Sequence, residues 1–451
     1  MQLAESLPGA EGLGRRLARR LGRYTRVGWA LADQVLVSAG NFVTVYLFAR
    51  GMGTAEFGSL MLARTGLLLL VSMQSALLTQ PHNVLGAALP GPAYRRFTGA
   101  LAVAQLLSGG ALLLALAAAA LALRGFGLPG AGHVLLALAV AAPPCLAQDF
   151  IRRVLYTRGA SCSAALNDGL TYGLQLGGAF ALMSVAPQRT GPAAALLVFG
   201  AASLAGAALG ALQLRAQVRL RRTGWRAWVR IWARVWDFGK WLTAQNAVVW
   251  LGAQGHAWVV GLLLGVEQVG LYRAATHLVN VLNPVRQAAF SYLPARASLA
   301  YQSGSASGLA RWVRKTGWLL GGVLAPLSLA LLVFPRELLQ LAYGARYASP
   351  RLALILGLSV VAQSVTFWKF PYDLGLLALR QTRAIFYANL VPVALLLTSG
   401  VALVHVLGIV GVPISGLLIN VSLLAVTWAA YKRRLRQAVR AEHSREGRPD
   451  E

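Results

Sequence analysis

The sequence predicts an all-α, polytopic membrane protein with about twelve transmembrane helices in two pseudo-symmetric six-helix lobes around a central cavity. The composition is 57% hydrophobic and only 12% charged, whereas soluble domains carry about 25% charged residues. Twelve apolar segments are long enough to cross a bilayer, and basic residues are distributed unequally between the segments that join them. Two halves of the chain also share a short repeated pattern.

Twelve segments meet the length that a membrane span needs, which is about 20 apolar residues. The predicted spans lie near residues 27–50, 57–81, 95–123, 132–151, 160–186, 190–214, 237–264, 269–293, 311–334, 350–374, 382–404 and 408–431. Lys and Arg collect on the cytoplasmic side of a membrane protein. With the N-terminus inside, 32 of the 42 basic residues fall on the inner side, six on the outer side and four within spans. The chain is therefore expected to cross the membrane many times, with both termini cytoplasmic.

The spans divide the chain into five predicted regions. These are a basic N-terminal segment (1–26), a first lobe (27–214), a linker helix (215–236), a second lobe (237–431) and a basic tail (432–451). "GTAEFGSL" at 53–60 matches "GVEQVGLY" at 265–272. Because each half has six spans, both halves face the same way, and an axis along the membrane normal would relate them.

The turn between the first two spans has a structural interpretation. Gly51 and Gly53 can end the first helix, Thr54 can cap the second, and Glu56 complements the dipole at its N-terminus.

The predicted linker helix has an aromatic face and a cationic face. Trp225, Trp228, Trp232 and Trp236 form one stripe at helical spacing, with Arg226, Arg230 and Arg234 opposite. Aromatic residues that bind nucleic acid must stack on bases, whereas indole rings backed by arginine suit a lipid headgroup boundary. The expected partners of this helix are anionic phospholipids at the cytoplasmic face, and no nucleic acid.

Polar residues within the spans mark the candidate substrate site. They concentrate in the first two spans of each half, and the candidate substrate-binding residues are Gln34, Asn41, Arg64, Gln245, His256, Arg273, His277 and Asn280. Asp33 and Arg286 are candidates for coupling or gating. A central arginine costs at least about 2.5–3.5 kcal/mol to insert. Few carboxylates lie within the spans to neutralise these arginines, which indicates an anionic substrate, although buried polar residues can also simply join helices.

Three motifs carry a family resemblance. "DQVLVSAGNF…ARGMGTAEFG" (33–58), the repeat at 265–272 and "YGARY" (343–347) resemble the polysaccharide-biosynthesis flippases of the superfamily that also contains multidrug and lipid-linked peptidoglycan-precursor transporters. The resemblance implies two lobes that alternate between inward-open and outward-open states in the bacterial cytoplasmic (inner) membrane. It also implies cavity arginines that hold the pyrophosphate of the substrate, and Arg64 and Arg273 match in kind.

Four functions remain open from the sequence. The first is a flippase for an undecaprenyl-pyrophosphate-linked oligosaccharide, with polysaccharide polymerase and export proteins as further partners. The second is a multidrug or cation exporter of the same superfamily, which would favour cavity carboxylates. A membrane glycosyl polymerase or ligase would need larger outer segments with catalytic groups, and a scaffold would leave the polar stripes without a purpose. No metal site is expected, because Cys145 and Cys162 lack metal-ligand spacing. No catalytic residue is expected either, since nothing resembles a paired acid/base site, and no cofactor is expected.

Overall fold

The computed structural model describes residues 10–86, 89–215, 224–379 and 381–446, and all the regular secondary structure in these residues is helical. The first half contains α1 (Ala10–Gly51), α2 (Thr54–Gln74), η1 (Ser75–Thr79), η2 (His82–Gly86), α3 (Gly91–Gly125), α4 (Pro129–Thr157), α5 (Ser161–Val185), η3 (Pro187–Arg189) and α6 (Pro192–Leu214). The second half contains α7 (Trp225–Leu264), α8 (Val266–Val279), η4 (Asn280–Leu282), α9 (Asn283–Val333), α10 (Pro335–Tyr343), η5 (Ala345–Tyr347), α11 (Pro350–Ala378), α12 (Thr382–Ala388), α13 (Leu390–Leu395), η6 (Leu396–Gly400), α14 (Val401–Leu407), η7 (Gly408–Val410) and α15 (Gly411–Glu446).

Each of the twelve predicted spans coincides with helical residues. Nine segments of the described chain are long and apolar enough to cross a membrane. The last of them, Ala384–Arg440, contains two predicted spans that meet at Gly408, whose φ is 62°. Two further predicted spans fall outside the nine, because polar residues lower the mean hydropathy of α5 and α8 has only 14 residues. The predicted fold class, a polytopic all-α membrane protein in two lobes, is confirmed.

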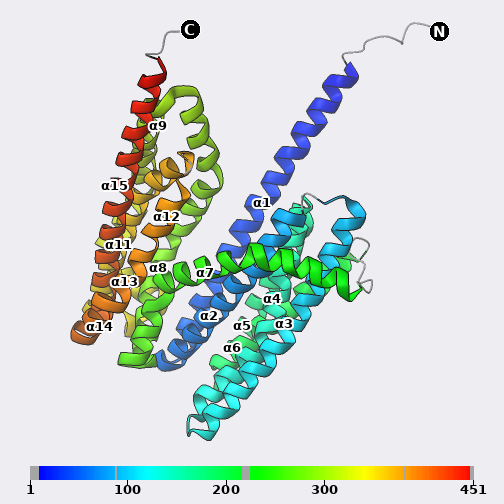
Figure 1. Ribbon diagram of the computed structural model, residues 1–451. Helices are drawn as coiled ribbons and strands as arrows, with labels where there is room; N and C mark the ends of the chain where they lie inside the picture. Colours follow the sequence, from blue (N-terminus) through cyan, green and yellow to red (C-terminus); the bar gives the residue numbers. More distant parts are fainter. Residues whose placement is uncertain (1–9, 87–88, 216–223, 380, 447–451) are drawn as a thin grey trace, which may run out of the picture.

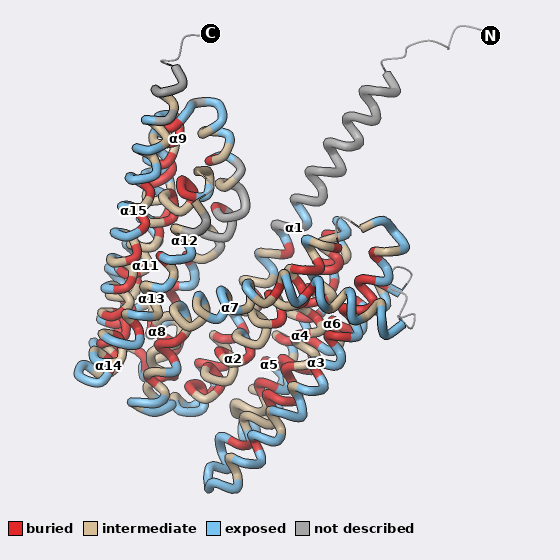
Figure 2. The backbone as a smooth tube through the Cα atoms, in the orientation of Figure 1, coloured by how far each residue is buried: buried red, intermediate tan, exposed pale blue. Residues whose placement is uncertain are grey.

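The two lobes each pack around a central helix. In the first lobe α4 packs against α3 and α6, while α1 packs against α5. In the second lobe α11 packs against α8, α9 and α15. Buried residues lie on the faces that these helices turn toward one another (Figure 2). The outer face of α3 exposes Leu106, Leu107, Leu114 and Leu121 by 61–69%, which suits contact with lipid.

The lobes meet where α2 crosses α8. In Figure 1 the two lobes converge at this crossing and separate toward the end where both termini lie. Gly58 of α2 and Gly270 of α8 lie at the crossing, and they occupy equivalent places in the repeated sequence pattern. A Cβ on Gly58 would lie 1.7 Å from the carbonyl oxygen of Val266, and one on Gly270 would lie 2.0 Å from that of Thr54. Only glycine allows this backbone approach, which closes one end of the space between the lobes.

A second contact joins the lobes near the same end. The η5 segment docks on the end of α1, where Arg346 donates to the carbonyl oxygen of Arg50 (2.8 Å) and the hydroxyl of Tyr347 donates to that of Ala49 (3.3 Å). Burial raises the pKa of Tyr347, so its hydroxyl stays protonated as the donor that this bond needs. We call η5 and the end of α1 the clasp.

Three predicted region boundaries fall inside continuous helices. α1 begins at Ala10, α15 continues to Glu446, and α7 joins the linker to the seventh span without a break. Part of the predicted linker, residues 216–223, lies outside the described residues. Helix limits do not test these region boundaries, because charged residues end a membrane span without ending a helix, whose backbone bonds are all internal.

The tryptophans of the α7 stripe are partly packed against protein and partly exposed on the surface. The rings of Trp225, Trp228 and Trp232 stack in series, with centroids 5.6 and 6.0 Å apart. Trp232 packs on the apolar core of the first lobe, whereas Trp225 is 73% and Trp236 51% exposed. Trp232, within the stripe, therefore attaches α7 to the first lobe, while both ends of the stripe are exposed.

The turn after α1 is capped differently from the prediction. Gly53 is the N-cap of α2, and Thr54 is its first helical residue. Glu56 accepts a hydrogen bond from the backbone N–H of Gly53 (3.1 Å). The side chain of Thr54 instead donates across the lobe interface to Glu267 (3.2 Å).

Candidate functional site

The second lobe contains a polar cavity of about 410 Å³ between α7, α8, α11 and α15. This volume lies in the range of sites for small molecules and substrate groups. Its polar lining side chains are Gln254, His256, Tyr272, Arg273, Thr276, Asn280, Asn283, Ser359, Gln363, Thr366 and Asn420. Arg273 is the one permanent charge among the described residues that line the cavity, and no carboxylate is among them.

Arg273 connects this cavity to the first lobe. Its guanidinium donates to Oε1 of Gln254 (3.0 Å) on α7 and to Oγ1 of Thr65 (3.1 Å) on α2. Its Nε is buried and makes no hydrogen bond with the described residues. A buried cationic donor without a partner is costly, and an anionic ligand would supply the missing acceptor.

Arg64 lies in the first lobe beside the same interface. It donates to Oδ1 of Asn41 on α1 (2.7 Å), and Asn41 in turn donates to the hydroxyl of Tyr172 on α5 (3.2 Å). Within the described chain, no carboxylate lies at ion-pair distance from Arg64 or Arg273. Arg273 bonds to Thr65, the residue that follows Arg64 in α2, so both arginines lie at the interface between α2 and α8.

The two arginines differ in depth. Arg64 lies six residues beyond the crossing glycine Gly58, and Arg273 lies three residues beyond Gly270. At 1.5 Å per helical residue this offset is about 4.5 Å. The repeat does not place them at the same level, so a diphosphate between them would lie obliquely.

The substrate-binding residues predicted on α7, α8 and η4 do not all lie in the polar cavity. His256 and Asn280 line the polar cavity, where His256 shares a hydrogen bond with the hydroxyl of Ser415 (3.0 Å). His277 is buried outside it, stacked on the ring of Phe42 (4.7 Å) and bonded to the hydroxyl of Tyr343 (3.0 Å). This position gives His277 a role in joining the lobes.

The remaining predicted residues lie apart from the cavity lining. Gln34 bonds to Ser38 one turn along α1 (3.4 Å), and Gln245 is exposed on α7. The backbone of Arg286 is in α9, but its side chain lies outside what the structure describes.

Asp33 belongs to a buried charge network in the first lobe. Arg152 donates to Asp33 (2.7 Å) and also pairs with Asp168, while Tyr156 donates to Asp33. Gln148 donates to Asp168 (2.8 Å). Asp33 and Asp168 are 1% and 0% exposed. Two carboxylates thus share one guanidinium, which leaves one negative charge to be balanced by a proton or a cation.

Most of this network is not predicted from the sequence. The predicted fourth span ends at residue 151, which places Arg152 in an inner loop, whereas α4 continues to Thr157. A signal was present in Asn167, Asp168 and Thr171, which follow helical spacing in α5 and are all buried. The prediction that polar groups concentrate in the first two spans of each half is therefore incomplete for the first lobe.

Sequence comparison gives one family match. Residues 179–350 match the family described as polysaccharide biosynthesis protein. No curated protein matches the chain.

Solved structures match nearly the whole chain. An inward-facing multidrug-resistance MATE transporter of the MOP superfamily is 14% identical, with a TM-score of 0.69, covering 90% of this chain and 96% of its own. An outward-facing conformation of such a transporter is 13% identical, with a TM-score of 0.63, covering 91% of this chain and 95% of its own. The third match is a MOP-superfamily transporter from Pyrococcus furiosus, described as having a binding pocket of reverse polarity. It is 13% identical, with a TM-score of 0.61, covering 90% of this chain and 94% of its own.

The chain has the MOP-superfamily transporter fold. This fold, together with the family match, confirms the resemblance to the polysaccharide-biosynthesis members of the superfamily.

Proposed function

We propose that this MOP-superfamily protein is a flippase that moves an undecaprenyl-pyrophosphate-linked oligosaccharide from the inner to the outer leaflet of the bacterial cytoplasmic membrane. The observation that supports this most directly is the polar cavity, which carries Arg273 without a carboxylate among its described lining. Guanidinium groups bind phosphate oxygens through paired, charge-assisted hydrogen bonds. The amide side chains of Gln254, Asn280 and Gln363 are suited to sugar hydroxyl groups.

Alternating access would move the substrate past the two arginines. The substrate enters where the lobes are separated, at the end of the termini, which we propose is cytoplasmic. The α2–α8 crossing and the clasp then open while the other end closes. Arg273 is positioned to exchange its bond to Thr65 on α2 for a phosphate oxygen as the lobes move apart.

We propose that the network around Asp33 couples transport to an ion. Its two carboxylates share Arg152, and the remaining negative charge can bind and release a proton or a cation. Asp33 lies on α1 and Arg152 on α4, so a change of charge would alter how these helices pack.

The alternative is a multidrug or cation exporter, which the similarity in fold to multidrug transporters favours. A cationic drug in this cavity needs a carboxylate there, but the described lining has none. A glycosyl polymerase or ligase is less well supported. Polysaccharide polymerase and export proteins are proposed partners.

Substitution of Arg64 and Arg273 tests the flippase proposal. Removing either guanidinium by alanine should weaken substrate binding about ten- to a hundredfold, because each loses one charge-assisted contact. Lysine should restore part of the activity, and glutamate should be worse than alanine because it repels the pyrophosphate. The measurement is polymer export in a strain lacking the wild-type gene, at matched membrane levels of each variant.

The control variant is Arg189→Glu, which reverses an exposed charge in η3 and should export normally. Wild-type export by both Arg64→Glu and Arg273→Glu would eliminate the paired-arginine mechanism. Efflux of a cationic dye that depends on the protein, without any export of polymer, would favour the drug exporter instead.

A further inference from the structure

Three hollows on the flank of the second lobe follow one another and share lining residues, and we call the series the track. The first, of about 740 Å³, lies between α9 and α11. The second, about 360 Å³, lies between α11 and α15, and the third, about 480 Å³, lies along the last described turns of α15. Trp368 lines the first and second, and Trp428 lines the second and third. The track therefore crosses α11 at one indole and continues along α15 at another.

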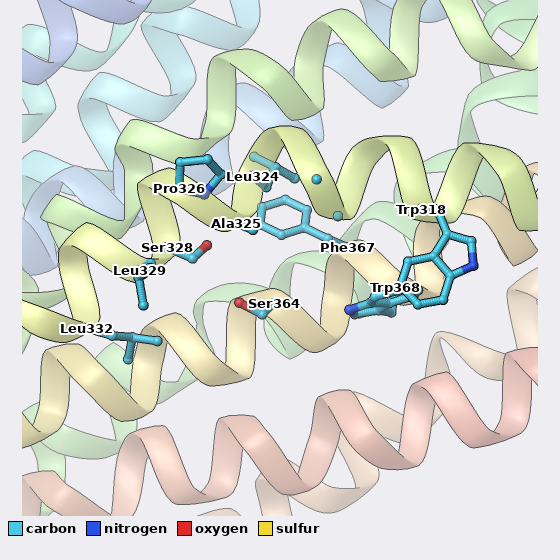
Figure 3. A pocket seen from close by; sticks show the side chains of 12 residues that line it. Trp318, Leu324, Ala325, Pro326, Ser328, Leu329, Leu332, Ser364, Phe367 and Trp368 are labelled. Atoms are coloured by element: carbon cyan, nitrogen blue, oxygen red, sulfur yellow. The ribbon is translucent and has the colours of Figure 1, made fainter.

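The first two hollows are apolar. Figure 3 shows Trp318 and Trp368 together at one end of the first hollow, with Leu329 and Leu332 toward the other end. The two indoles meet edge to face, with ring centroids 5.3 Å apart. Trp318 is 68% and Trp368 41% exposed. Exposed indoles beside an apolar groove are suited to hydrocarbon chains near a membrane interface.

The third hollow is cationic. Its lining includes Lys432, Arg433, Arg436 and Arg440, and no carboxylate is among the described residues that form it. The ammonium of Lys432 lies 3.8 Å from the centre of the Trp428 ring. This cation–π contact fixes a positive charge where the apolar part of the track ends. The track thus has one basic end and a long apolar body, as the two parts of an anionic lipid require.

The length of the track along α15 matches a lipid in one leaflet of the membrane. From Val421 to Lys432 the helix rises about 16 Å, since each residue adds 1.5 Å. One leaflet contributes about half of the roughly 30 Å hydrocarbon core. A headgroup at Lys432 therefore allows one acyl chain to follow α15 down to Val421. The α9–α11 hollow, which shares Trp368 with this groove, would accommodate a second chain.

We propose that this flank binds one anionic phospholipid, with its phosphate at Lys432, Arg433 and Arg436 and its acyl chains in the two apolar hollows. The site is separate from the polar cavity, because α11 lies between them. Gln363 and Thr366 line the cavity, whereas Phe367 and Trp368 line the flank. The bound lipid would hold α9, α11 and α15 together while the lobes move, and its binding does not depend on which substrate the protein transports.

The first experiment is lipid binding to the purified full-length protein by native mass spectrometry at low salt. Phosphatidylglycerol should bind more tightly than phosphatidylcholine. The triple variant Lys432→Gln, Arg433→Gln and Arg436→Gln should lose roughly 100-fold in affinity, as about 1 kcal/mol for each basic residue implies. The matched control is Arg311→Gln, Arg314→Gln and Lys315→Gln, which removes the same charge from exposed positions on α9. This control should bind like wild type.

A second variant tests the path of the acyl chain without changing charge. Ala425 is exposed and lines the groove between α11 and α15. Ala425→Phe should fill this groove and weaken phosphatidylglycerol binding about tenfold. Val426→Phe, on the neighbouring exposed position outside the lining, should have little effect. Melting temperatures in a zwitterionic detergent should match wild type for all variants, which shows that each is folded.

Three results would overturn the proposal. Equal losses in the two triple variants would show that only net surface charge attracts the lipid. Equal binding of phosphatidylcholine and phosphatidylglycerol would remove the role of the basic cluster. Unchanged binding by Ala425→Phe would exclude the groove as the place of the chain. None of these measurements uses transport, so a failure here is distinct from a failure of the flippase proposal.

Discussion

Single residues give the two lobes different charged sites. The first lobe buries two carboxylates, Asp33 and Asp168, that share Arg152. The second lobe places Arg273 against neutral acceptors and leaves its Nε without a hydrogen bond to the described residues. The carboxylate pair therefore lies apart from the arginine-lined cavity.

Loss of Arg152 should destabilise the protein strongly. Arg152→Gln leaves two buried carboxylates without a counter-charge, and breaking a buried pair in this way typically costs about 3–5 kcal/mol. Adding Asp168→Asn should recover much of the loss, because it removes one of the two negative charges. The control is Arg153→Gln, whose ion pair with Asp149 is 3.6 Å long and whose side chain is 46% exposed. Its effect should be under about 1 kcal/mol.

Thermal melting of the purified protein in one detergent measures these differences. A melting temperature for Arg152→Gln equal to that of Arg153→Gln would show that the network is not what stabilises the first lobe.

Among the helical elements, the α2–α8 crossing holds the closed end. Its two glycines come from the repeated pattern that the sequence shows at residues 53–60 and 265–272. The repeat can be recognised from the sequence. The sequence does not show that the two copies of the repeat, on α2 and α8, contact each other. That contact depends on how the two lobes pack, and no local pattern encodes it.

A larger side chain at the α2–α8 crossing should favour the state in which the lobes are separated at this crossing. Gly58→Ala and Gly270→Ala each force a Cβ against a backbone carbonyl. Overpacking costs about 1–3 kcal/mol, and the cost applies only to the state in which the helices touch. The population should therefore shift about 5- to 150-fold toward separated helices. Distance measurements between spin labels at Ala55 and Gln268 would detect the shift.

The control for this experiment is Gly173→Ala in α5, where a Cβ would meet nothing within 4 Å. An unchanged distance distribution in both crossing variants would mean that α2 and α8 do not need this close approach.

For the whole molecule, the clasp and the α2–α8 crossing lie at the end opposite the termini (Figure 1). The loops predicted on the outer side gather there, as the bonds between Arg346 and Arg50 and between Thr54 and Glu267 show. This grouping agrees with the alternation of loops predicted from the distribution of Lys and Arg.

Orientation can be tested by labelling. In a background without Cys145 and Cys162, a cysteine at Ala348 should react with an impermeant reagent in intact cells. A cysteine at Ser305, where α9 bends with a φ of 60°, should react only after the inner face is opened. A cysteine at Thr223 should behave like the one at Ser305, although this position lies outside the described residues. External labelling of Ser305 would reverse the proposed orientation and the direction of transport with it.

The sequence by itself determined that the protein is a polytopic all-α membrane protein, because the thickness of the hydrocarbon core sets the length of each apolar helix. It also indicated the two-lobe repeat and the intramembrane arginines, since both are visible in local residue patterns. Helical periodicity placed Arg273, His277 and Asn280 on one face, but it could not decide what that face meets.

Only the tertiary structure decided those partners. It buries His277 between Phe42 and Tyr343, while His256 and Asn280 line a cavity with Arg273. It also brings Arg152 of α4 between carboxylates from α1 and α5. The physical reason is that a few degrees of helix rotation change which side chains meet across an interface. That rotation is set by packing among residues far apart in the chain, such as Gly58 against Gly270, and not by the residues that will bind or pair.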